Sequence, residues 1–183
     1  MENIKQPPIN AVTEEQIQKE KEKETNYLDK HPETRLTYKD SSKVNKETDK
    51  PITLPWKPFS QCTDAEKEKY NLAQLQHDII ILDIEDKTKQ VELTNKLISD
   101  KRKFYVHDSG SRGLHYHLPM PELEQYSQEE RTQIRKLFFD LYKEFNPDYN
   151  VASDNTVIAR PFMPHHKTLR PKTFPFLRKT YSR

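Results

Sequence analysis

The feature that most constrains the fold is the apolar run Ile79–Leu82, which is followed directly by Asp83-Ile84-Glu85. A short run of branched aliphatic residues is typical of a strand that is buried on both faces. Such runs are rare in this 183-residue chain, because 32% of its residues are hydrophobic, 33% are charged and the mean hydropathy is −1.07. The sequence therefore predicts an ordered domain organised around this strand, with other segments too polar to fold.

Cysteine usage and hydropathy exclude several classes of protein. The single cysteine, Cys62, rules out an intrachain disulfide and a cysteine-based zinc cluster. No apolar run reaches the roughly 18 residues that a membrane-spanning helix needs, and no signal peptide is recognisable. We therefore expect a soluble, intracellular protein that does not associate with a membrane.

Composition divides the chain into three parts. Residues 1–50 are rich in Lys, Glu, Thr and Asn, which predicts a disordered charged arm, with a transient helix over 16–24 or a partner-binding role. Residues 51–170 should form the ordered domain, beginning near the only tryptophan, Trp56. Residues 171–183 are a basic C-terminal tail.

Two capping boxes and the spacing of apolar residues predict the secondary structure of the ordered part. Thr63 and Glu66 mark a short helix that should run to about Gln76, and Ser127 and Glu130 mark a longer one. The pattern predicts strands at 79–83, 104–107, 114–118 and 157–159, and helices at 88–99 and 127–145. The order β-α-β-β-α-β indicates an α+β fold with both helices on one face of a sheet.

Apolar periodicity also predicts which faces are buried. In the strand 114–118, His115 and His117 should share one face, opposite the apolar side chains. The longer helix should bury the stripe Ile134, Leu137, Phe138, Leu141 and Phe145.

Two carboxylates follow the apolar strand. Because alternate residues of a strand share a face, Asp83 and Glu85 should point together while Ile84 enters the core. A divalent cation relieves the repulsion between such a pair, and Mg2+ prefers oxygen ligands. A third carboxylate would complete a two-metal site for nucleotidyl transfer.

The only two glycines of the chain, Gly110 and Gly113, lie in one turn. Their N–H groups can approach and cradle a phosphate, while Ser109 and Arg112 add a hydroxyl donor and a forked cation. His115 should point toward the same place. The simpler alternative is a tight hairpin with Arg112 in solvent.

The segment from Arg160 to the C-terminus is basic, with no acidic residue and with interleaved aromatics. This combination is typical of a surface for nucleic acid or polyphosphate, although a tail without a fixed partner has the same composition. A less favoured hypothesis is zinc binding by histidines. Its candidate ligands are His115, His117, His165 and His166.

Taken together, these motifs resemble the archaeo-eukaryotic primase superfamily. Asp83-Ile84-Glu85 is similar to the first family motif, Asp-x-Asp/Glu, and residues 109–115 match the Ser-Gly-x-Arg-Gly-x-His form of the second. The third motif is an Asp that precedes a basic residue and a Pro-Phe-…-His-…-Lys-Thr stretch. Asp148, followed by Arg160 and residues 161–168, resembles it, with Asp154 as a rival for the carboxylate.

The resemblance implies a primase-type catalytic core with an RRM-like module and an activity in primer synthesis. It implies that Asp83, Glu85 and Asp148 are catalytic and hold Mg2+ or Mn2+. The residues that it assigns to binding of the incoming nucleotide are Ser109, Arg112, His115, Arg160, His166 and Lys167. The implied partners are a single-stranded DNA template, nucleoside triphosphates and a large primase subunit or helicase. The implied location is the cytoplasm, or the nucleus or nucleoid at replication sites.

Two other functions compete with this interpretation. The chain can be a non-catalytic, primase-like accessory subunit that binds nucleic acid or nucleotide. It can also be an adaptor whose RRM-like sheet and basic tail bind single strands without a divalent metal.

Overall fold

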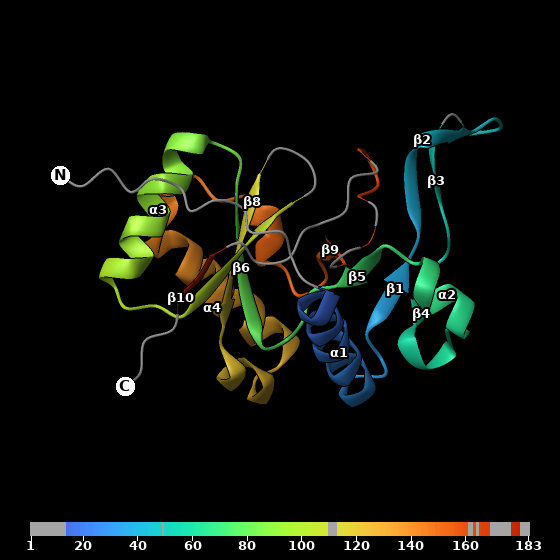
Figure 1. Ribbon diagram of the computed structural model, residues 1–183, viewed down its shortest axis with the longest axis horizontal. Coiled ribbons are helices and arrows are strands. Elements are labelled where there is room, and N and C mark those ends of the chain that lie inside the picture. The colour runs from blue at the N-terminus through green and yellow to red at the C-terminus, as the bar shows by residue number, and fades with distance from the viewer. Residues whose placement is uncertain are drawn as a thin grey trace.

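The computed structural model describes residues 14–48, 50–109, 113–160, 163, 165–168 and the backbone of 177–179 (Figure 1). Within these residues the chain forms two four-stranded antiparallel sheets and a two-stranded ribbon. The fold is therefore mixed α+β, as the sequence predicts.

The first sheet, called the β6 sheet, has the strand order β10-β7-β8-β6. Its strands are β6 (Ile79–Ile84), β7 (Phe104–Asp108), β8 (Leu114–Pro119) and β10 (Leu177–Lys179). Two helices, α3 (Lys87–Ser99) and α4 (Gln128–Leu141), pack on one face, because both contribute to the same apolar cluster as β6. That cluster includes Ile80, Leu82, Leu93, Leu97, Phe138 and Phe139.

The second sheet, called the β5 sheet, has the order β4-β1-β5-β9. Its strands are β1 (Arg35–Thr37), β4 (Lys57–Pro58), β5 (Leu72–Gln74) and β9 (Val157–Ala159). The ribbon consists of β2 (Lys39–Asn45) and β3 (Lys50–Thr53). Helix α2 (Asp64–Lys69) and the short 3-10 helices complete the fold: η1 (Phe59–Gln61), η2 (Pro121–Gln125), η3 (Lys143–Phe145) and η4 (Tyr149–Ala152).

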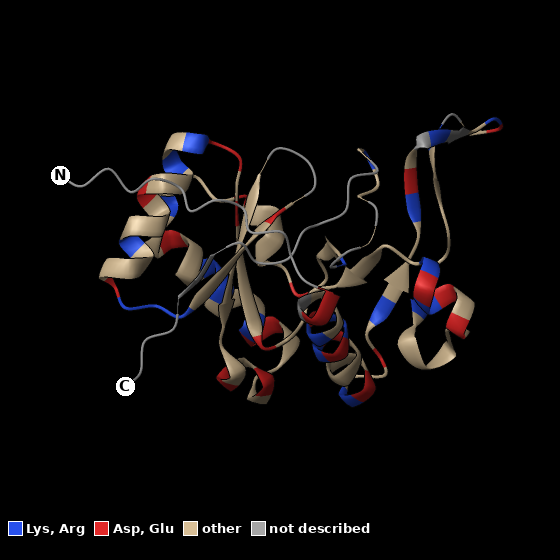
Figure 2. Cartoon of the chain, viewed as in Figure 1, with Lys and Arg blue, Asp and Glu red and all other residues tan. Residues whose placement is uncertain are grey.

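The prediction of a disordered arm is wrong for residues 14–48. Glu14–Lys30 forms helix α1, which carries both charge signs along its length and lies between the two sheets (Figures 1 and 2). Its last turns bury Tyr27 and Leu28 in a cluster with Leu36 of β1. The physical reason is that Tyr27 and Leu28 are buried against the fold and Glu24 pairs with Arg160, so tertiary contacts hold a helix that is too charged to form by itself. Residues 1–13 lie outside the described residues.

The predicted six-element sheet is correct only up to α4. The strand β9 pairs with β5, antiparallel, instead of lying beside β6. Helix α2 also ends at Lys69 rather than near Gln76, because Leu72–Gln74 is drawn into the β5 sheet between β1 and β9. Both predicted capping boxes are present, at Thr63 and at Ser127.

The buried face of α4 differs from the predicted stripe. Leu137 and Leu141 are 67% and 66% exposed, whereas Arg131 and Arg135 are buried. The cause is Asp154, a buried carboxylate that accepts hydrogen bonds from both guanidinium groups. Apolar periodicity could not reveal this arrangement, because an arginine is ordinarily assigned to the exposed face of a helix.

Candidate functional site

A cavity of about 410 Å³ is lined by residues of both sheets. Asp83 and His115 come from the β6 sheet, and Asp148 precedes η4. Other lining residues come from the β5 sheet, the ribbon and the segment after β9. The polar ones among them include Thr37, Lys39, Thr53, His165 and His166. The cavity thus collects carboxylates, imidazoles and a lysine from distant parts of the chain.

Asp83 and Asp148 are joined through the backbone. The N–H of Asp148 donates a hydrogen bond to the carbonyl oxygen of Asp83 at 3.1 Å. One oxygen of Asp148, Oδ1, accepts from the N–H of Asn150 at 3.0 Å and thereby caps η4. The structure therefore places Asp148, rather than Asp154, beside the Asp-x-Glu motif.

The carboxylate of Asp83 has one engaged and one unpaired oxygen. Its Oδ2 lies 3.5 Å from Nε2 of His115, the residue directly opposite on β8. Its Oδ1 is buried and has no hydrogen-bond partner among the described residues. A buried acceptor without a partner costs free energy, so this atom is suited to a bound cation or proton donor.

Gly113 packs directly against this carboxylate. A Cβ atom added there would lie 2.7 Å from Asp83 Oδ1, 3.2 Å from the carbonyl oxygen of Ile84 and 3.6 Å from Cγ of Glu85. The glycine is therefore required for space. Ser109 is buried and accepts a hydrogen bond from the Gly113 N–H through its hydroxyl. Gly110, Ser111 and Arg112 lie outside the described residues.

The side chain of Glu85 is less well placed than that of Asp83 to bind a cation in the cavity. The strand β6 ends at Ile84, so Glu85 lies one residue beyond it and is exposed. Although its side chain lies beside Gly113, it does not line the cavity. The alternation of a strand no longer fixes its direction, because the strand has ended.

Two histidines and a lysine also line the cavity. His166 bonds through Nδ1 to the hydroxyl of Ser41 at 2.9 Å, and its carbonyl accepts from the Ser41 N–H at 2.7 Å. Burial, assisted by His165 and by two lysines, lowers the pKa of His166 to about 4. Burial also lowers the pKa of His165, whose ring stacks on that of His166. Both imidazoles are therefore neutral at pH 7, and Lys39 supplies the positive charge.

Two other predicted site residues, Arg160 and Lys167, have contrasting surroundings. Arg160 is buried, pairs with Glu24 of α1 at 2.9 and 3.0 Å and donates to the carbonyl oxygens of Lys67 and Tyr70. Its guanidinium is therefore engaged in holding α1 to the β5 sheet. Lys167 is exposed next to the two histidines.

Sequence reasoning missed Lys39 and Thr37. Both lie in the segment that composition assigned to the disordered arm, and the buried Leu36 directly before Thr37 was the available signal. The backbone of Lys39 is held by the side chain of Asn71, which accepts from its N–H at 2.9 Å and donates to its carbonyl at 2.8 Å. The lysine is thereby fixed at the start of β2.

A metal-ligating group exists elsewhere. In the described part of the chain, His31, Glu33 and His77 are the group of three whose ligand atoms all lie within 4.8 Å of one another. These residues can hold a metal ion. Neither the three predicted carboxylates nor the four histidines at 115, 117, 165 and 166 form such a group.

Comparisons with protein-family models, with curated protein sequences and with solved structures found no match. Among the described helices, none combines the length and the apolar character needed to cross a bilayer.

Proposed function

We propose that this chain is a metal-dependent nucleotidyltransferase of the primase type, which synthesises primers on a single-stranded DNA template. The observation that carries the proposal is the cavity that Asp83 and Asp148 line together with Lys39 and the paired histidines. Carboxylates together with cationic and imidazole groups in one cavity suit a nucleoside triphosphate bound with a divalent cation. The motifs that resemble the primase superfamily point to the same chemistry.

The donor set fits Mg2+ or Mn2+. Asp83 Oδ1 is a buried oxygen without a partner in the described residues, and Asp148 lies in the same cavity. Both metals prefer carboxylate oxygens and water. Glu85 would join this set by rotation of its exposed side chain. A cation held there would supply positive charge to the phosphate oxygens of the nucleotide.

The chain's own residues would position the substrates. Lys39 and Lys167, whose charges act on the imidazole of His166, would neutralise the triphosphate, with Ser109 and Arg112 acting from the glycine turn. His115, 3.5 Å from Asp83 Oδ2, would hold that carboxylate in orientation. The 3′ oxygen then forms a bond to the α-phosphorus while the bond from that phosphorus to the pyrophosphate oxygen breaks. Charge stabilisation is the main contribution of the protein.

The test is primer extension with Mn2+, a single-stranded DNA template and either ribo- or deoxynucleotides. Asp83→Asn should reduce incorporation at least a hundredfold, because it removes a charge from the cation site. The matched control is Asp64→Asn, whose carboxylate is 98% exposed on α2. Extension by Asp83→Asn at the wild-type rate would show that the site is misassigned.

The exposed position of Glu85 and the engagement of Arg160 favour a second candidate, a non-catalytic accessory subunit. Such a subunit would bind nucleotide or template without incorporating it, together with a large primase subunit or helicase. Incorporation assays on the protein alone and with a large primase subunit separate the two. Template binding without incorporation in both assays favours the accessory subunit.

A further inference from the structure

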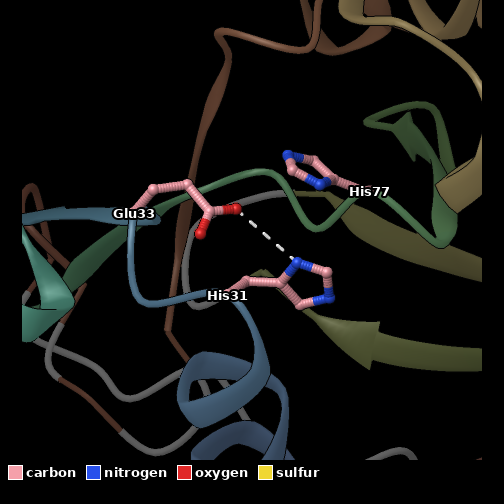
Figure 3. A group of neighbouring side chains, drawn as sticks. All are labelled: His31, Glu33 and His77. Carbon is pink, nitrogen blue, oxygen red and sulfur yellow. Dashed lines mark ion pairs between the residues drawn. The ribbon is translucent and has the colours of Figure 1, made fainter.

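We propose that His31, Glu33 and His77 form a zinc site that fastens the turn after α1 to the segment entering β6 (Figure 3). His31 and Glu33 follow α1, and His77 precedes the strand that carries Asp83. The proposal concerns a place outside the 410 Å³ cavity and does not depend on the proposed function.

The geometry brings three ligand atoms together. Nδ1 of His31 lies 3.6 Å from a carboxylate oxygen of Glu33, and the rings of His31 and His77 meet edge to face with centroids 5.3 Å apart. All three ligand atoms lie within 4.8 Å of one another. Tetrahedral zinc separates its ligands by roughly 3.3 Å, so small side-chain rotations would close the site.

A carboxylate lies near the Nε2 atom of each imidazole. Nε2 of His31 lies 3.5 Å from Glu124, and Nε2 of His77 lies 3.9 Å from Asp154. A histidine that binds metal through one nitrogen usually presents its other N–H to a carboxylate, which fixes the ring and strengthens the ligand. Glu124 is close enough to His31 to take this role after a small rotation, whereas Asp154 lies farther from His77 and already pairs with Arg131 and Arg135.

The surroundings favour a cation with imidazole ligands. The side chains of His31 and His77 are 18% and 19% exposed, so both imidazoles are largely enclosed beside the carboxylate of Glu33. Two imidazoles and one carboxylate select zinc over Mg2+, which prefers oxygen. The side chain of Glu33 is 63% exposed, whereas that of His31 is 18% exposed. The site is therefore open on one side, for entry of the ion and for a water ligand.

A metal here would stiffen the segment that leads into β6. The backbone of residues 76–79 is already held from within by Arg135, which donates to the carbonyl oxygens of Gln76, His77 and Ile79. Zinc would hold the same segment from the side of α1. The ordered state of α1, β1 and the start of β2, including Lys39, would then depend on the metal.

The experiment measures bound zinc in full-length protein that carries Asp83→Asn and Asp148→Asn, so that the carboxylate cavity contributes little. After removal of metal with a chelator, ZnCl2 is added and free ion is removed by gel filtration. We expect one zinc per chain and a rise in Tm. Glu33→Gln and His77→Gln should each abolish the bound equivalent, and Glu124→Gln should weaken the affinity 10- to 100-fold.

The exposed Glu122→Gln, close in sequence to Glu124, is the matched control and should bind like the parent. Because Glu33 is exposed, its variant folds even if His77→Gln does not. Zinc retained by Glu33→Gln with the parent's affinity, or absence of zinc from the parent protein, would overturn the proposal. Neither result bears on nucleotide incorporation, which is assayed separately with Mn2+.

Discussion

The N–H of Asp148 donates a hydrogen bond to the carbonyl oxygen of Asp83, 3.1 Å away, and joins the end of β6 to the start of η4. Both side chains line the same cavity. The backbone, and not a side-chain contact, therefore sets the relative position of the two carboxylates. Either carboxylate can be changed to an amide without breaking this link, which makes the pair accessible to substitution.

Asp148→Asn and Asp154→Asn should separate function from stability. Asn caps a helix as well as Asp, so Asp148→Asn should change the free energy of unfolding by less than roughly 0.5 kcal/mol. Asp154 is 1% exposed and pairs with Arg131 and Arg135, so Asp154→Asn should cost roughly 3–5 kcal/mol. Urea unfolding measures both, and Mn2+-dependent extension should be lost in Asp148→Asn. Equal losses of unfolding free energy in Asp148→Asn and Asp154→Asn would contradict the assignment of Asp148 to the site and of Asp154 to stability.

Gly113→Ala should act on the Asp83 carboxylate. The new methyl group would meet Asp83 Oδ1 at 2.7 Å, and that side chain can move away more easily than the backbone oxygen of Ile84 at 3.2 Å. We expect Mn2+ affinity, measured by calorimetry, to fall at least tenfold with a destabilisation of roughly 1–2 kcal/mol. The control is the double variant Gly113→Ala with Asp83→Asn, whose Mn2+ affinity should equal that of Asp83→Asn alone. If the losses of Mn2+ affinity in the two single variants add up in the double variant, Gly113→Ala does not act through the Asp83 carboxylate.

Glu24→Gln should loosen α1 from the β5 sheet. The carboxylate of Glu24 is 12% exposed and holds two nitrogens of Arg160. Leaving that guanidinium partly unpaired should cost roughly 1–3 kcal/mol. Hydrogen exchange of amides 14–30 should accelerate, whereas Glu22→Gln, at an exposed position on the same helix, should not change it. Unchanged exchange in Glu24→Gln would mean that Tyr27 and Leu28 alone dock the helix.

The free energy of unfolding should fall as the pH decreases from 6.5 toward 4. The imidazole of His166 titrates near 6.5 when unfolded, but burial lowers its pKa to about 4 in the folded chain. Over this range the unfolded chain binds more protons, so acid favours unfolding. The lowered pKa values of His165 and His77 act in the same direction.

His166→Gln should flatten this dependence when Tm is measured between pH 4 and 6.5. Ser41→Ala is the matched control, because it removes the Ser41–His166 side-chain hydrogen bond while keeping the imidazole. A slope of the same steepness in wild-type protein and His166→Gln would exclude His166 as the cause.

Local patterns predicted the elements around the site well. The apolar run is strand β6, and the capping boxes at Thr63 and Ser127 begin helices as expected. These features depend on neighbours in the sequence, so they can be read from it. The placement of Asp148 beside Asp83 depends instead on a backbone hydrogen bond between segments that are distant in the sequence.

What the sequence could not determine are the contacts between distant segments. Only the tertiary structure decided that Arg160 pairs with Glu24, that Lys39 reaches the cavity and that His77 meets His31. The sequence by itself determined the strand that carries Asp83 and the starts of helices α2 and α4, because the hydrogen bonds of a capping box and the apolar run of a strand involve near neighbours. Removing a charged side chain from water costs free energy, and an opposite charge or a carbonyl oxygen nearby offsets that cost. Tertiary packing decides which such group lies near each buried charge, so its partner cannot be read from the local sequence.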